Sequence, residues 1–118
     1  MSTARYTGSC HCGAVRYGVT ADLSSTISCN CSICRRTGMI LTFVPADQFQ
    51  LQSGADHLAD YQFGQKRVHH LFCKSCGVRS FGRGSGPDGR EMVAINVRCL
   101  DGVDLGSLTP RAYDGARL

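Results

Sequence analysis

Seven of the eight cysteines in this chain stand in three closely spaced groups, and cysteine thiolates at such spacings hold metal ions or act as nucleophiles. The groups are Cys10 with Cys12, then Cys29 with Cys31 and Cys34, and then Cys73 with Cys76, while Cys99 stands alone. In a reducing compartment such groups bind metal or do redox chemistry more often than they form disulfides. The spacing therefore predicts metal sites and disfavours a disulfide framework.

Residues 73–77, CKSCG, have the form of a zinc knuckle, in which a tight turn brings two sulfurs together and the glycine accepts a left-handed backbone. Two more sulfurs complete a tetrahedral site, and Cys10 with Cys12 can supply them. In an extended segment these two cysteines point to the same side and His11 points away, which argues against His11 as a ligand. A redox dithiol would need a strand followed by a helix, and residue 73 is expected between strands. We therefore predict a closed, structural four-cysteine site.

The middle group, Cys29, Cys31 and Cys34, has three sulfurs and no fourth cysteine nearby in the sequence. Three protein ligands with an open position are typical of catalytic zinc, whereas structural zinc is closed. These three cysteines are therefore the candidate catalytic residues. Side chains elsewhere could close the site: Cys99, His57, and either His69 or His70, because adjacent strand residues face opposite ways.

The chemistry of such a site favours thiols over water. Zinc with three thiolates carries a net charge of −1, so it acidifies bound water less than zinc held by neutral imidazoles, which disfavours a hydrolase. Soft ligation accepts an incoming thiolate readily and keeps its sulfur nucleophilic. Arg35 and Arg36 follow directly and are candidates to bind an anionic substrate, although they could equally be solvated surface charges.

The elements that position these residues are expected to be mostly short β-strands. Val15, Tyr17 and Val19 share one face of a strand, and further strands are expected at residues 39–44, 49–52, 78–84 and 91–100, with a hairpin formed by 60–64 and 66–73. Residues 32–37 favour a short helix ended by Gly38, and residues 104–108 a single turn. Residues 109–118 are expected to form a surface tail.

Length and charge limit the function. The 118 residues fit one domain, and the chain has neither a signal-peptide pattern nor a membrane-length apolar run, so we expect a cytoplasmic protein without membrane contact. The formal net charge is +4, but seven thiolates and two zinc ions add −7 + 4 = −3 and leave about +1. This near-neutral charge disfavours nucleic acid as a partner.

Four blocks of the sequence, CHCGAVRY, CNCSICRRTG, FCKSCGVRSFG and NVRCLDGVD, occur in an order and spacing that resembles the glutathione-dependent formaldehyde-activating enzyme family. That family shares its domain with centromere protein V, and the resemblance covers about residues 5–114. It implies a small all-β fold of the Mss4-like type with two zinc ions. It also implies a structural site at Cys10, Cys12, Cys73 and Cys76, and a catalytic site at the other three grouped cysteines.

The resemblance further implies a carbon–sulfur lyase that combines glutathione with formaldehyde. Our hypothesis is a zinc enzyme that acts on the adduct of a thiol, plausibly glutathione, with a small aldehyde. The alternative is a non-catalytic, zinc-stapled protein-interaction module in which a fourth protein ligand closes the three-cysteine site. A third reading leaves that site empty until a metal ion arrives with glutathione.

Overall fold

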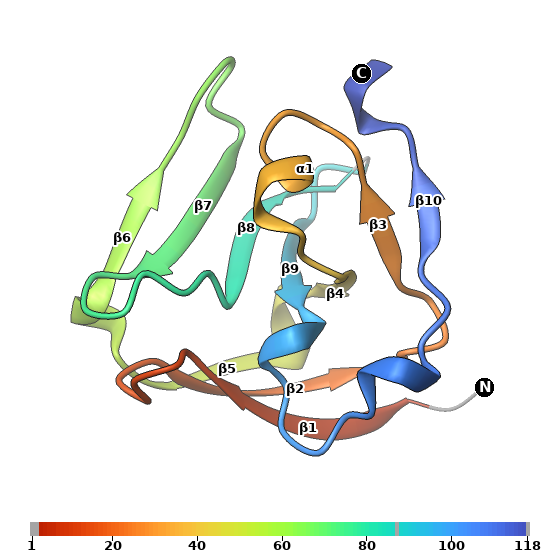
Figure 1. The fold of residues 1–118 in the computed structure, drawn as a ribbon. Helices are drawn as coiled ribbons and strands as arrows, with labels where there is room; N and C mark the ends of the chain where they lie inside the picture. The colour runs from red at the N-terminus through yellow and green to blue at the C-terminus, as the bar shows by residue number, and fades with distance from the viewer. Residues whose placement is uncertain (1–2, 87, 118) are drawn as a thin grey trace.

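The computed structural model describes residues 3–86 and 88–117, which form two β-sheets that pack against each other (Figure 1). The smaller sheet is antiparallel and has the order β1 (Ala4–Ser9), β2 (Arg16–Ala21) and β5 (Phe49–Ser53). Val15, Tyr17 and Val19 are fully buried, as their alternation with less apolar residues predicts. This sheet closes the bottom of the molecule in the view of Figure 1.

The larger sheet has seven strands in the order β10, β3, β4, β9, β8, β7, β6. Their bounds are β3 Ile27–Cys29, β4 Leu41–Pro45, β6 Leu58–Tyr61, β7 Val68–Cys73, β8 Phe81–Ser85, β9 Glu91–Asn96 and β10 Arg111–Tyr113. All neighbours are antiparallel except β10, which runs parallel to β3. Figure 1 shows the β6–β7 hairpin on one flank of this sheet and the β3–β10 pair on the other.

Three aromatic rings form the centre of the core between the sheets. Tyr17 from β2 lies with its ring centroid 5.3 Å from that of Phe49 and 5.6 Å from that of Phe81, and the two phenylalanine rings are 4.6 Å apart. Val93 and Ile95 of β9 complete this layer with no exposed surface. Each such side chain stabilises the fold by roughly 1.5–3 kcal/mol through burial. The core thus fixes β8 and β9, which carry the floor of the cavity described below.

The remaining elements are short. The helix α1 (Cys34–Thr37) ends at Gly38, whose φ of 69° suits glycine and whose N–H donates to the carbonyl of Cys34 at 2.9 Å. In the described residues, four 3-10 turns lie between strands and a fifth follows β10: η1 (Ala46–Gln48), η2 (Ala55–His57), η3 (Val97–Cys99), η4 (Leu105–Ser107) and η5 (Gly115–Arg117). The predicted helix and the predicted turn at 104–108 are both present.

The prediction of a mostly β fold of short, mainly antiparallel strands is confirmed, with differences at particular ends. The strand expected at 91–100 stops at Asn96, because the Asn96 side chain accepts the N–H of Arg98 and starts η3. The prediction of a surface tail was wrong for β10, which is exposed but pairs with β3. Within the described part of the chain, no helix is long and apolar enough to cross a membrane.

Candidate metal centres and an adjoining cavity

The two outer cysteine groups meet in space. One sulfur from each of Cys10, Cys12, Cys73 and Cys76 lies within 4.8 Å of the others. The Sγ of Cys12 is 3.7 Å from the Sγ of Cys10 and 3.7 Å from the Sγ of Cys73. A tetrahedral zinc ion with bonds of about 2.3 Å to sulfur places its ligands about 3.8 Å apart. The donor set and spacing therefore fit a zinc ion, and we call this four-cysteine group the staple.

Two tight turns present the staple sulfurs. Cys10 and Cys12 lie in the turn between β1 and β2, which corrects the expectation of an extended segment there. Gly13 (φ 83°) and Gly77 (φ 78°) supply the left-handed positions that these turns need. His11 is exposed and lies outside the group, in agreement with the sequence.

Backbone N–H groups favour the ionised form of two staple sulfurs, those of Cys73 and Cys76. The N–H groups of Cys12 and Val78 lower the pKa of the Cys76 thiol to about 6. The N–H of Cys76 is the largest contribution to a lowered pKa at Cys73, which also accepts the N–H of Ser75 at 3.4 Å. Hydrogen bonds to a charged form stabilise that form, so the turns prepare thiolates for a cation.

The middle group forms a second cluster, which we call the three-cysteine cluster. Cys29 ends β3, Cys31 lies in the following turn and Cys34 begins α1, and their sulfurs lie within 4.8 Å of one another. Among residues 3–86 and 88–117, no other cysteine, histidine or carboxylate joins this group. Cys99 instead contacts Asn96 and the carbonyl of Arg79. The described residues therefore offer this cluster three candidate metal ligands and no fourth.

The three sulfurs cannot all ionise without a cation. Burial and the Cys31 sulfur raise the pKa of Cys34 to about 12. Burial also disfavours the Cys31 thiolate, but the N–H of Cys34, 3.4 Å from its sulfur, helps to hold the Cys31 pKa below its usual value. One thiolate thus forms readily and raises the pKa of its neighbour. A soft divalent ion would offset this repulsion, so the donor set fits zinc.

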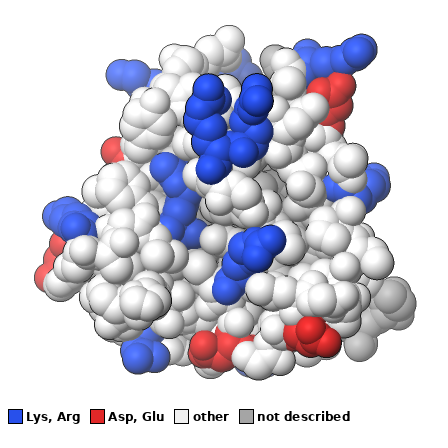
Figure 2. Space-filling view, viewed as in Figure 1, with Lys and Arg blue, Asp and Glu red and all other residues white. Residues whose placement is uncertain are grey.

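Arg35 and Arg36 lie on one side of the three-cysteine cluster. Together with Cys31 and Asn30 they line a polar hollow of about 430 Å³, which Ser32 and Ala116 also border. Arg36 donates to the carbonyl of Ser32 and both arginines are exposed. Figure 2 shows lysine and arginine side chains over α1 and in the middle of this face, whereas acidic side chains lie towards its edge.

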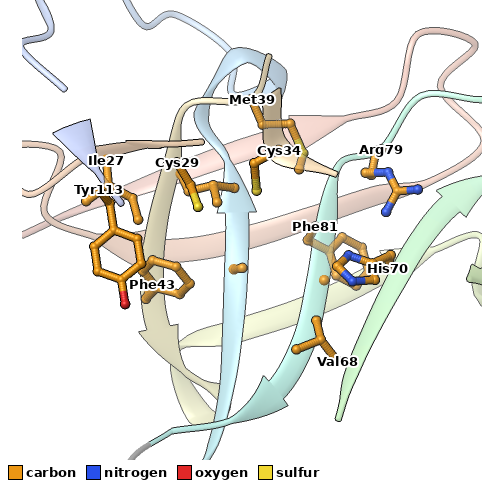
Figure 3. Close-up of a pocket in the computed structure, with 13 residues that line it drawn as sticks. Ile27, Cys29, Cys34, Met39, Phe43, Val68, His70, Arg79, Phe81 and Tyr113 are labelled. Atoms are coloured by element: carbon orange, nitrogen blue, oxygen red, sulfur yellow. The ribbon is translucent and has the colours of Figure 1, made fainter. Parts of the chain in front are cut away.

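The opposite side of the cluster opens on an apolar cavity of about 190 Å³, which sequence reasoning missed (Figure 3). Cys29 and Cys34 form part of its wall, and the rest comes from β3, β4, β7, β8, β9 and β10, from Met39, and from Arg79 in the segment before β8. His70 and Arg79 are its titratable lining residues besides the cysteines and Tyr113. Cys31, Arg35 and Arg36 do not line it. The cluster therefore separates a charged hollow from an apolar cavity.

His70 and Arg79 reach this cavity because the sheet register brings β7 and β8 opposite the cluster. The His70 ring stacks on Phe63, with centroids 5.2 Å apart, and burial lowers the His70 pKa. His69, its neighbour on β7, points elsewhere, with Nδ1 2.6 Å from the Asp60 carboxylate. Arg79 lies 5.8 Å from the centre of the Phe72 ring, and its Nη1 is buried without a hydrogen-bond partner. Strand pairing between residues distant in sequence brings His70 and Arg79 together, so no local sequence pattern marks this position.

Comparisons with known proteins agree with this geometry. A model of the glutathione-dependent formaldehyde-activating enzyme family matches residues 5–114. The chain belongs to this family. The glutathione-dependent formaldehyde-activating enzymes are named for an activity on glutathione and formaldehyde, which supports a glutathione-linked function. The match spans the staple, the three-cysteine cluster and both arginines of α1.

A solved structure also resembles the chain. The crystal structure of a Rhodobacter sphaeroides protein is 32% identical, and the match covers 91% of this chain and 98% of that chain with a TM-score of 0.80. The two proteins therefore share one fold over most of this chain and nearly all of that chain.

Proposed function

We propose that the protein is a zinc-dependent enzyme of the carbon–sulfur lyase type, which acts on the adduct of glutathione with a small aldehyde. The observation that carries this proposal is the three-cysteine cluster, which lacks a fourth protein ligand in the described residues and lies between two hollows. Cys29, Cys31 and Cys34 would hold the catalytic ion. Cys10, Cys12, Cys73 and Cys76 would hold a structural ion.

Zinc, when bound, supplies a positive charge that keeps a substrate sulfur in the thiolate form while leaving it nucleophilic. The chain itself positions the thiol. Arg35 and Arg36 border the polar hollow beside Cys31, where their guanidinium groups can pair with the carboxylates of glutathione. The mostly apolar lining beside Cys29 and Cys34 offers water few hydrogen-bond partners on the other side, which would favour the aldehyde over its hydrate there.

The proposal is tested with cobalt in place of zinc, because cobalt–thiolate absorption reports on the ligands directly. We expect two ions per chain, one for each cysteine group, and a spectral change when glutathione is added. Cys34→Ser should abolish the change, whereas Cys99→Ser, at a cysteine outside both groups, should retain it. Two ions with no response to any small thiol would favour a non-catalytic interaction module. One ion that becomes two when glutathione is present would mean that the metal arrives with the thiol.

Arg35→Gln and Arg36→Gln test the role of the polar hollow. Exposed ion pairs contribute about 0.2–1 kcal/mol, so each substitution should raise the KM for glutathione by about 1.5- to 5-fold and affect kcat less. An unchanged KM in the double variant would assign both arginines to the solvated surface.

A further inference from the structure

The apolar cavity beside the three-cysteine cluster is larger than formaldehyde requires. Its volume is about 190 Å³. A water molecule in the liquid occupies about 30 Å³, and an apolar protein cavity of about 150 Å³ holds benzene. Formaldehyde has only two heavy atoms, so it would leave most of the cavity unfilled. The cavity has the size of an aldehyde with about six or seven carbons.

The residues that line the cavity favour an apolar ligand. Aliphatic and aromatic side chains make up most of the wall, including Phe43, Val68, Phe81 and Ala94, and no acidic residue takes part. The peptide part of glutathione carries two carboxylates and an ammonium group, which are costly to bury without partners. Those groups suit the hollow beside Arg35 and Arg36 instead. The cavity on the opposite side of the cluster is left for the carbonyl compound.

The guanidinium group of Arg79, a lining residue of the cavity, is not fully paired. The Nη1 atom of Arg79 is buried and makes no hydrogen bond, and an unpaired buried donor costs about 1–3 kcal/mol or more. No carboxylate lines the cavity to pair with it. Figure 3 shows Arg79 and His70 on the same flank of the cavity, with the sulfurs of Cys29 and Cys34 above its centre. Arg79 also lines the cavity, so its guanidinium group can donate to a carbonyl or hydroxyl oxygen of a ligand there.

We propose that the aldehyde partner of this enzyme is apolar and larger than formaldehyde, with its hydrocarbon group in the cavity and its oxygen directed to Arg79. This inference rests on the proposed function. The thiolate sulfur bonds to the carbonyl carbon, the C=O π pair moves to oxygen, and that oxygen takes the proton that the thiol gave up. The product is an S-(1-hydroxyalkyl) thioether, and the reverse step expels the thiolate.

The cavity continues into a second hollow of about 460 Å³, which shares Ile27, Phe43, Val68, Ala94 and Tyr113 with it. A longer chain would therefore leave the cavity rather than collide with a wall. Affinity should rise with chain length while the cavity fills and then level off near six carbons.

Stable analogues test this without turnover. We would measure by calorimetry the affinity of the purified, zinc-loaded chain for S-methyl-, S-propyl-, S-butyl- and S-hexylglutathione, and for acetamide, butanamide and hexanamide, whose carbonyl is unreactive. Each buried methylene is expected to strengthen binding about fourfold. Rates with glutathione and the matching aldehydes, followed by exchange NMR, should give a parallel rise in kcat/KM.

Cavity-filling variants assign the effect to this site. Ala94→Leu should abolish the gain with chain length, whereas Ala112→Leu, on exposed β10 and outside the cavity, should keep it. If Ala94→Leu does not fold, Val68→Phe serves instead, because the Val68 side chain is 42% exposed and tolerates enlargement.

The outcomes separate the two proposals. A rise with chain length in both series supports the inference. A rise with the amides alone supports an apolar carbonyl ligand but overturns glutathione as the thiol. Turnover of formaldehyde with no rise in either series overturns the inference and leaves the proposed function standing. Failure of both series to bind, without turnover of any aldehyde, overturns both.

Discussion

Replacing Cys73 with serine should cost the protein much more stability than replacing Cys34. The staple joins positions that are far apart in the chain, since Cys12 and Cys73 are separated by 61 residues. The loop-closure relation for a cross-link gives about 4 kcal/mol for a loop of that length and about 2 kcal/mol for the five-residue span from Cys29 to Cys34. Cys73 is also only 1% exposed, so a serine hydroxyl there would be buried.

Domains of this size are stable by about 5–15 kcal/mol, so the loss of the staple removes a large part of the total. We would measure the urea unfolding of zinc-loaded wild type, Cys73→Ser and Cys34→Ser by circular dichroism, with Cys99→Ser as the matched control. Cys73→Ser should be unfolded or lose at least about 4 kcal/mol, and Cys34→Ser should stay folded without activity. Equal destabilisation of the two variants would refute the division into a structural and a functional site.

Three further outcomes test the cavity and its surroundings. Arg79→Gln should weaken hexanamide binding about 10- to 100-fold, because a hydrogen bond from a charged group contributes about 1.5–3 kcal/mol. Arg79→Lys should recover part of the loss. Equal affinities of the wild type and Arg79→Gln for hexanamide would show that Arg79 does not bind the ligand. The folded state lowers the pKa of His70 below its usual value of 6.5, so the unfolded chain binds more protons between the two pKa values, and the free energy of unfolding should fall as the pH drops from 6.5 through the folded-state pKa. In His70→Phe, the free energy of unfolding measured in urea should depend less on pH over this range. The same pH dependence in both proteins would contradict this reasoning. A Cβ on Gly115 would lie 2.5 Å from the sulfur of Cys29, so Gly115→Ala should lower cobalt binding at the three-cysteine cluster. Gly106→Ala is the control, because a Cβ there would lie 3.4 Å from its nearest atom. Equal cobalt spectra for the two variants would show that η5 shifts to accommodate the added methyl group.

The grouping of the cysteines could be predicted from sequence because the chemistry of a candidate metal site is local. Cys73 and Cys76 share one turn, and a tetrahedral ion needs two more sulfurs, so the pairing with Cys10 and Cys12 follows from counting. The conformation at Cys10 was mistaken for an extended segment, because the left-handed position at Gly13 turns the chain there. Spacing indicates which sulfurs meet more reliably than it indicates the backbone between them.

The cavity could not be predicted because no local pattern encodes it. His70 and Arg79 reach the cluster only through the register of β7, β8 and β9, which joins residues distant in sequence. Arg35 and Arg36 were candidate substrate ligands on account of their position next to Cys34, and the structure places them on the polar side of the cluster rather than at the cavity. Adjacency in sequence predicted two cations beside the cluster, whose role in binding stays a prediction, and it did not indicate the cavity on the other side.

The strand β10 was missed for a different reason. Its residues 111–113 are all exposed, so they lack the alternation that marks a half-buried strand. Parallel pairing with β3 holds it, and the Asn30 side chain reinforces the pairing by contacts with Asp114 and Ala116.

This pairing places the edge strand of the larger sheet, β10, at the border of the cavity. Tyr113 lines both the cavity and the hollow beyond it, and Gly115 lies against Cys29, yet β10 is only three residues long and ends the strand order. Hydrogen bonds at such an edge open with the smallest free energy in a fold. The rate of product release would then depend on how often β10 separates from β3. Turnover of bulky adducts should share its temperature dependence with amide exchange at Arg111, and strengthening the pairing should slow the enzyme while stabilising it.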